Sequence, residues 1–219
     1  MKKINKKLNM LGNILIIVVV FLCGFNVTYA YFTAKATVEG SLTFYDLNVT
    51  FAYTASGSNQ SESTGTTEFE VIPNTNSILR GYDFSFKLAN GTAITNVGLM
   101  PSNTSCDSYA RLTVSAIKMV KSGDSYTVDT TDTTDYGQYI LLTTTTSVQK
   151  SGEFYYLKSV MQAGGYYAMA TGATISTDAP ADVTSSYLKI TIKFEAVQAK
   201  KEAVVASFGE SAANLLGVN

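Results

Sequence analysis

Residues 187–199 read YLKITIKFEAVQA, and this stretch decides the predicted fold. Apolar side chains occupy every second position, and polar or charged side chains stand between them. The apolar positions are Leu188, Ile190, Ile192, Phe194 and Ala196. Because successive side chains of a strand point to opposite faces, this alternation predicts a long β-strand with one buried face.

Shorter stretches with the same alternation precede this strand through most of the chain. They cover residues 42–44, 47–53, 69–71, 84–88, 94–99, 110–116, 126–128, 154–160 and 168–175. Many short alternating strands separated by turn residues predict an all-β fold, an antiparallel jelly-roll-like or immunoglobulin-like β-sandwich. Residues 55–66 are rich in Ser, Gly and Thr and predict a loop, whereas residues 136–148 are ambiguous and allow a helical turn. The sequence shows no repeat and no Pro-rich or charged linker, so we expect one sandwich domain over residues 42–219.

The end of the chain departs from the strand pattern. Between residues 200 and 216 the apolar residues recur at steps of three and four, which is the spacing of one helix face. We therefore expect a short C-terminal helix over residues 200–216. Gly209 lies in its middle and weakens it by about 1 kcal/mol relative to alanine.

The first thirty residues have the organisation of a secretory signal peptide. Four lysines stand within residues 1–9 without any acidic residue, and an apolar run follows at residues 10–25. Thr28 and Ala30 stand at the −3 and −1 positions of a cleavage site before Tyr31. The apolar run is shorter than the roughly 20 residues that cross a bilayer as a helix. We expect a signal-peptide helix over residues 1–30, processing by a signal peptidase and a secreted protein. Retention as an uncleaved membrane anchor stays open as the alternative.

Cleavage before Tyr31 changes the composition that bears on function. The full chain has 219 residues, no histidine, two cysteines and a formal net charge of −1. The 189 residues from Tyr31 onward carry 12 basic and 17 acidic residues, a net charge of −5, and keep Cys106 alone. Without histidine, a Ser-His-Asp triad, a Cys-His pair and an HExxH zinc site are excluded, and Cys106 has no base to activate it. We therefore expect no enzymatic activity and no cofactor. An acidic chain is also unsuited to neutralising phosphates, so we expect no nucleic-acid partner.

Two further groups of residues are candidates for binding sites. Asp129, Asp132 and Asp135 recur at every third position, and carboxylate oxygens are ligands that suit Ca²⁺. The D-x-D-x-D-G spacing of a calcium loop is missing from the sequence, so a solvated acidic loop is favoured over a metal site. The tyrosine pairs at 155–156 and 166–167 suit stacking against carbohydrate or a partner, although packing within the fold is the commoner role.

Residues 31–39, YFTAKATVE, alternate as cleanly as the long strand. Phe32, Ala34, Ala36 and Val38 share one face, and no proline interrupts the stretch. Cleavage before Tyr31 places this strand at a new N-terminus. Two interpretations stay open on these residues alone: an edge strand within its own domain, or a strand donated to another subunit by β-augmentation.

Four stretches of the chain resemble one family of exported proteins. They are TYAYFTA at residues 28–34, GSLTF at 40–44, YDFSFKLANGT at 82–92 and LKITIKFEAVQA at 188–199. In this order they are similar to the signal-peptide boundary, the first strand, a middle strand with its turn, and the near-terminal strand of the TasA and camelysin-like proteins. Those proteins are exported by Gram-positive bacteria and carry SipW-type signal peptides.

The resemblance implies a jelly-roll sandwich and, for the fibre-forming members, an extracellular biofilm-matrix or cell-surface fibre. Subunits of such a fibre assemble by donor-strand complementation, in which residues 31–41 here would complete the sheet of a neighbouring subunit. Phe32, Ala34, Ala36 and Val38 would then fill its pockets. The expected partners are copies of this chain or related fibre subunits.

Two alternatives to a fibre subunit accompany the resemblance. The first is a camelysin-like surface metalloprotease. A chain without histidine would have to bind zinc with carboxylates alone, an unfavourable set for that metal. The second is a monomeric secreted accessory or binding module.

Overall fold

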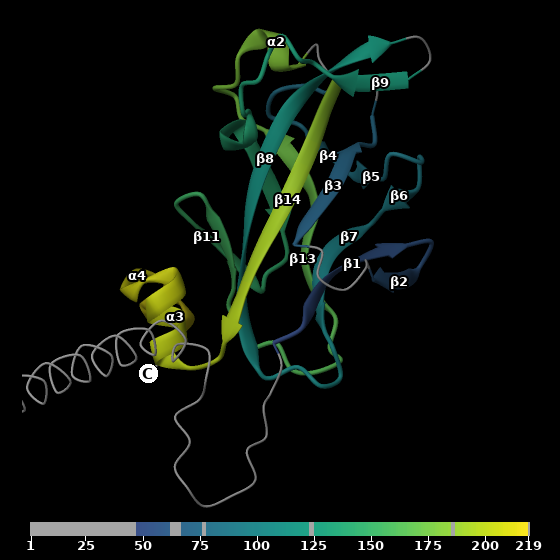
Figure 1. Cartoon of the computed structure of the whole chain (residues 1–219). Helices are drawn as coiled ribbons and strands as arrows, with labels where there is room; N and C mark the ends of the chain where they lie inside the picture. Colours follow the sequence, from purple (N-terminus) through teal and green to yellow (C-terminus); the bar gives the residue numbers. More distant parts are fainter. Residues whose placement is uncertain (1–46, 62–66, 76–77, 123–124, 185–186, 219) are drawn as a thin grey trace, which may run out of the picture. The chain divides into compact units, whose positions relative to one another are not determined.

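The computed structural model describes residues 47–61, 67–75, 78–122, 125–184 and 187–218 (Figure 1). These residues belong to one compact unit. The predicted signal peptide at 1–30 and the donor-strand candidate at 31–41 lie outside them and stay predictions. Among the residues that the structure describes, no helix has both the length and the apolar character needed to cross a membrane.

Two β-sheets make up most of this unit, and every pairing between their strands is antiparallel. In spatial order the first sheet contains β10 (Ile140–Thr144), β13 (Tyr167–Ile175), β7 (Asn96–Pro101), β1 (Val49–Ala55) and β2 (Ser58–Ser61), and β4 (Asp83–Phe84) also pairs with β13. The second contains β11 (Val148–Ser151), β12 (Phe154–Leu157), β8 (Ser108–Ser122), β14 (Tyr187–Gln198), β3 (Glu68–Pro73), β5 (Phe86–Lys87) and β6 (Ala93–Ile94), and β9 (Ser125–Val128) pairs with β8. The all-β fold is therefore confirmed, whereas its jelly-roll character stays a prediction.

The strand predicted from residues 187–199 is β14, and it lies in the middle of the second sheet (Figure 1). It pairs along its whole length with β8, from Tyr187 opposite Met119 to Gln198 opposite Ser108. The side chains of Leu188, Ile190 and Ile192 are fully buried, as the alternation predicts.

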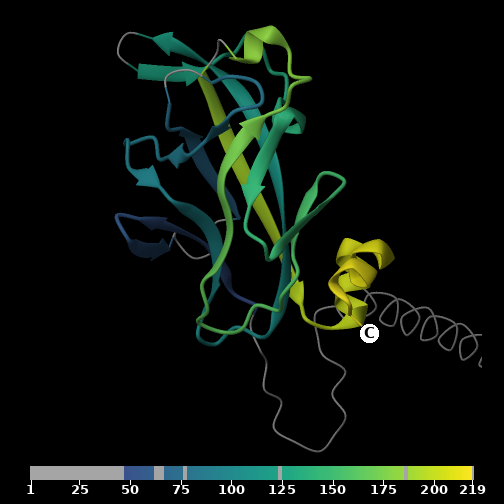
Figure 2. The same cartoon turned by 180° about the vertical axis from the view of Figure 1, so that it is seen from behind.

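The inner faces of the two sheets share one hydrophobic core. Phe51 of β1 in the first sheet lies with its ring 5.5 Å from that of Phe69 of β3 and 4.9 Å from that of Phe194 of β14, both in the second sheet. Figure 2, seen from behind, brings the first sheet to the front, with β13 in light green. This aromatic contact holds the two sheets face to face, which is the arrangement of a β-sandwich.

The predicted helical C-terminal segment at 200–216 is confirmed, but it consists of two helices instead of one. They are α3 (Lys201–Phe208) and α4 (Glu210–Leu216). Gly209 separates them with a φ of 89°, a backbone conformation that glycine adopts without the steric cost that other residues carry. Both helices contribute to a second hydrophobic cluster with β8 and β12, formed by Tyr109, Tyr156, Val204, Phe208, Ala212, Ala213 and Leu216.

Short elements depart from the predicted strands or lie where the prediction was ambiguous. β2 lies inside the expected loop at 55–66, where Ser56 and Gly57 both have positive φ and form the two-residue turn of a β1–β2 hairpin. The 3₁₀ helix η1 (Gly137–Tyr139) and then β10 occupy the ambiguous stretch at 136–148, so its helical turn is confirmed. The single-turn helix α2 (Ala181–Thr184) was not predicted.

Candidate functional site

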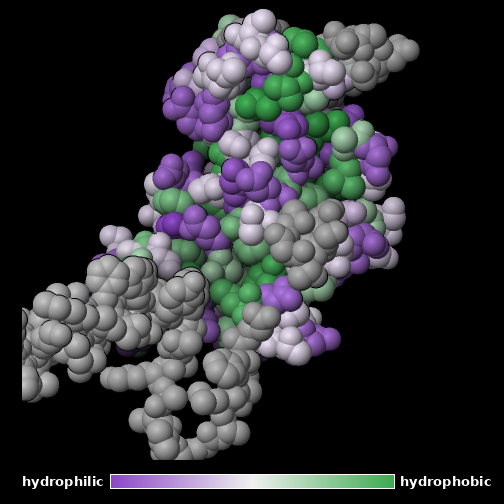
Figure 3. Space-filling view, viewed as in Figure 1, coloured by the Kyte–Doolittle hydropathy of each residue, from purple (hydrophilic) through white to green (hydrophobic). Residues whose placement is uncertain are grey.

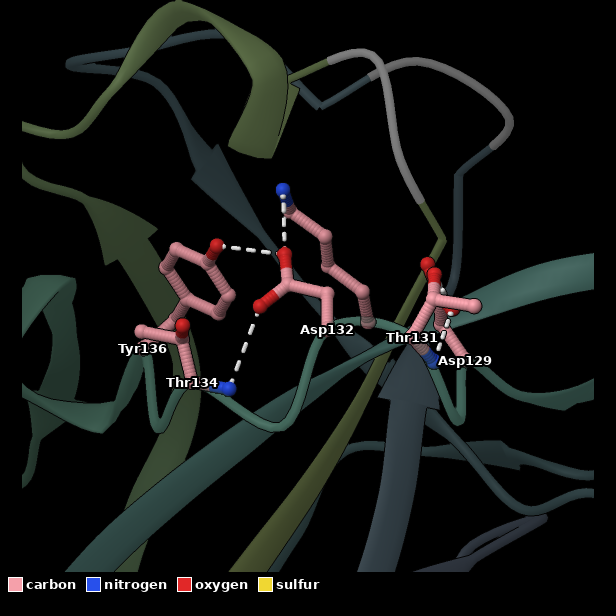
Figure 4. Close-up of polar contacts among 6 residues, drawn as sticks. Asp129, Thr131, Asp132, Thr134 and Tyr136 are labelled. Atoms are coloured by element: carbon pink, nitrogen blue, oxygen red, sulfur yellow. Dashed lines mark hydrogen bonds and ion pairs between the residues drawn. The ribbon is translucent and has the colours of Figure 1, made fainter.

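The acidic loop follows β9 and contacts the buried Lys118 of β8. The Lys118 ammonium lies 2.8 Å from Oδ2 of Asp132, although the Lys118 residue is only 8% exposed. Tyr136 donates its hydroxyl to the same oxygen at 2.7 Å, and the amide of Thr134 donates to Oδ1 at 3.1 Å (Figure 4). The Lys118 ammonium also lies 4.8 Å from the centre of the Tyr136 ring, a cation–π distance.

These contacts keep the Asp132 carboxyl ionised. Hydrogen bonds from Lys118 first, and then from Tyr136 and Thr134, hold the pKa of Asp132 well below its usual range. The pKa of Asp129 is also lowered, because the hydroxyl and amide of Thr131 both donate to its carboxylate. The acidic loop is thus fixed to β8 by a charged pair at the border of the core.

The three aspartates that the sequence offered as calcium ligands each bind a different part of the chain. Asp129 binds within its own turn and Asp132 binds Lys118, while Oδ1 of Asp135 accepts the amides of Ala116 and Gly137, both at 2.8 Å. Across the described parts of the chain, no group of three or more acidic or cysteine side chains is placed to hold a metal ion. Asp129, Asp132 and Asp135 are therefore not brought together as the ligands of one cation.

Replacing Asp132 with asparagine is expected to lower the free energy of unfolding at pH 7, because the buried Lys118 loses a carboxylate partner. The folded-state pKa of Asp132 is lowered, so its stabilising effect is present above the unfolded pKa of about 4 and is lost as the pH falls below it. Urea midpoints of the two proteins should differ most at pH 7 and converge as the pH falls from about 4. The exposed Asp178→Asn variant is the control. A difference for Asp132→Asn that stays constant down to the lowest pH would contradict this account.

A cleft of about 360 Å³ lies between the β11–β12 hairpin and η1. Its polar lining includes Asp135, Gln138, Lys150 and Glu153. Asp135 already accepts two main-chain amides, and Lys150 lies 5.3 Å from the ring centre of Tyr155. The cleft therefore presents side chains of both charges beside the carboxylate of Asp135.

Tyr155 and Tyr156 are buried in the two hydrophobic clusters, so their rings pack within the fold. The Tyr155 hydroxyl also accepts the amide of Leu142 at 3.1 Å. Tyr166 is half-buried, with its hydroxyl 3.3 Å from that of Thr54. The Cys106 thiol is partly buried, and this burial raises its pKa, which favours the unreactive protonated form.

The outer edge of β3 is the feature that the sequence did not reveal. The amide of Phe194 in β14 donates to the carbonyl of Thr67 at 3.0 Å, so the odd residues of this strand direct their main-chain groups towards β14. The amides and carbonyls of Glu68 and Glu70 then point to the opposite side, because main-chain direction alternates along an antiparallel strand. On that side β5 pairs only with Ile72 and Pro73, and no other strand of the described residues pairs there.

The side chains along this edge also alternate. Phe69 and Val71 face the core, whereas Glu68 and Glu70 lie on the outer face, 2.6 Å from Lys193 and 2.7 Å from Lys189 respectively. Figure 3 shows hydrophilic side chains across the middle of this face, over β3 and β14. The β3 edge therefore combines main-chain groups that no described strand pairs, an apolar inner side and a charged outer side.

The structure does not place the predicted processing and donor residues. Thr28, Ala30 and Tyr31 of the cleavage site and Phe32, Ala34, Ala36 and Val38 of the donor strand lie outside the described residues. Comparison of the chain with protein-family models, with curated proteins and with solved structures finds no match.

Proposed function

We propose that this chain is a secreted structural subunit of an extracellular biofilm-matrix or cell-surface fibre. It polymerises by donating its mature N-terminal strand, residues 31–41, to the next subunit. One observation carries the proposal: the alternating segment 31–39 belongs to a chain whose sandwich presents, at Glu68 and Glu70, edge main-chain groups that no described strand pairs. An added strand satisfies such groups with main-chain hydrogen bonds, and its alternate side chains enter pockets.

Donation of this kind is head-to-tail, because the donating and accepting surfaces are different parts of the subunit. Such a contact does not close on itself unless the rotation forms a ring, so it propagates a filament. The partners are then copies of this chain or related subunits.

Charge placed on the inner face of the donor strand is expected to stop polymerisation. The full chain is secreted from a Gram-positive host that carries a SipW-type signal peptidase, and the released protein is studied by electron microscopy and size-exclusion chromatography. The double variant Ala34→Asp with Ala36→Asp should raise the concentration needed for filaments at least about 100-fold, because it buries unpaired carboxylates in the acceptor.

The matched control places two charges on the other face of the strand. Thr33→Lys with Thr37→Lys adds two ammonium groups at the outward positions, which suit the acidic edge residues Glu68 and Glu70, and should leave filaments intact. Filaments from the Ala34/Ala36 variant at wild-type concentrations would rule the proposal out. A wild-type protein that stays monomeric at high concentration, with Tyr31 at its N-terminus, would instead indicate an accessory or binding module.

A further inference from the structure

The β3 edge sets a limit on where an added strand can lie. β5 already pairs with Ile72 and Pro73, so a new strand has room beside β3 only from Val71 towards Thr67. Glu68 and Glu70 supply two amides and two carbonyls along that length. An added strand that begins beside Val71 can have very few residues before its first paired residue, because β5 occupies the space beyond. A mature N-terminus at Tyr31 meets this condition, since only Tyr31 precedes Phe32.

The two faces of segment 31–39 fit the two sides of this edge. Residues directly opposite each other on neighbouring strands share a face, so the apolar residues Phe32 and Ala34 belong beside Val71 and Phe69. Phe69 packs against Phe51 and against Tyr53, whose ring lies 5.4 Å away, so the inner side of this edge is apolar, as the inner face of the donor strand requires.

Charge on the outer face and the position of β5 together set the register, because a shift that brings Lys35 opposite Glu70 would place Thr33 opposite Ile72, which β5 already pairs. With Phe32 opposite Val71 in an antiparallel pairing, Lys35 falls opposite Glu68. Glu68 is exposed and its Oε1 lies 2.6 Å from Lys193 of β14, so a lysine on a strand added at the other side would be a second cation beside the same carboxylate. A cross-strand pair of opposite charges stabilises the pairing in which the two residues are directly opposite each other.

We propose that the acceptor is the β3 edge of a second copy of this chain, with Phe32 opposite Val71, Ala34 opposite Phe69 and Lys35 opposite Glu68. This inference rests on the proposed function and names the partner surface of the same strand. We expect the added strand to run antiparallel to β3, because every strand pairing within the two described sheets is antiparallel.

A disulfide between two separately made chains tests the acceptor. In a Cys106→Ser background, one chain carries Lys35→Cys and the other carries Glu68→Cys, so a mixed disulfide joins two molecules by necessity. Glu153→Cys, on the exposed β11–β12 turn, is the matched control. The Lys35–Glu68 heterodimer should exceed the control heterodimer at least about tenfold, because a docked strand holds the two thiols at millimolar effective concentration.

The outcomes separate this inference from the proposed function. Filaments without the Lys35–Glu68 disulfide above control would overturn the β3 acceptor and leave donation itself standing. Absence of both filaments and the mixed disulfide would overturn both. A monomeric chain that carries both cysteines and closes an internal disulfide would show that the strand pairs within its own domain, which also overturns both.

Discussion

Truncation of Phe51 to alanine is expected to lower the free energy of unfolding by about 3–5 kcal/mol. The Phe51 side chain is fully buried and contacts Phe69 and Phe194, so its loss leaves a cavity between the two sheets. Domains of this kind are stable by about 5–15 kcal/mol in total, so the variant should lose a large fraction of its stability. Urea unfolding followed by tyrosine fluorescence or circular dichroism measures the difference.

Tyr82→Ala is the aromatic control for this experiment. The Tyr82 side chain is 68% exposed, so its truncation should change the free energy of unfolding by less than about 1 kcal/mol. If Phe51→Ala cost no more than Tyr82→Ala, the aromatic contact between β1, β3 and β14 would not be what holds the sheets together.

The strands that alternate strongly could be predicted from the sequence, because burial on one face leaves a period of two. β14 shows this in Leu188, Ile190 and Ile192. β2 could not be found in this way, since its four residues are all exposed and polar. The signal that was present is the Ser56–Gly57 pair, a two-residue turn of the kind that joins hairpin strands.

The acidic loop shows a second limit of the sequence. The three-residue spacing of Asp129, Asp132 and Asp135 suggested one shared role, but their partners are set by distant strands. The sequence did contain a sign of this contact in β8, where Lys118 stands on the same inward-facing side of the strand as Leu112 and Ala116. A lysine at an inward position needs an acidic partner, and Asp132 supplies it from the border of the core.

The β3 edge could not be predicted, because an edge is defined by which strands are neighbours. Alternation in residues 69–71 indicates which side chains face the core, but it carries no information on pairing. That the main-chain amides and carbonyls of Glu68 and Glu70 point away from β14 follows from the hydrogen bond between Phe194 and Thr67, a contact between residues far apart in the sequence.

Arg111 of β8 joins the C-terminal helices to the second sheet. Its guanidinium lies 3.8 Å from the ring centre of Phe154 and 4.5 Å from that of Phe208, and its Nε donates to Glu195 at 2.8 Å. The Phe208 ring also makes an edge contact with Tyr156 at 6.1 Å. Phe208 is therefore the side chain through which α3 meets both the cation and the aromatic residues of the sheet.

Replacement of Phe208 with alanine is expected to release α3 and α4 while the two sheets stay folded, because the second hydrophobic cluster is separate from the main core. A loss of about 3 kcal/mol in this cluster should speed amide hydrogen exchange in residues 201–216 on the order of 100-fold. Ser207→Ala, at the exposed neighbouring position of the same helix, should leave exchange there nearly unchanged. Equal acceleration of exchange in β8 and β14 would contradict local release, since it would mean that the helices and the sandwich unfold as one unit.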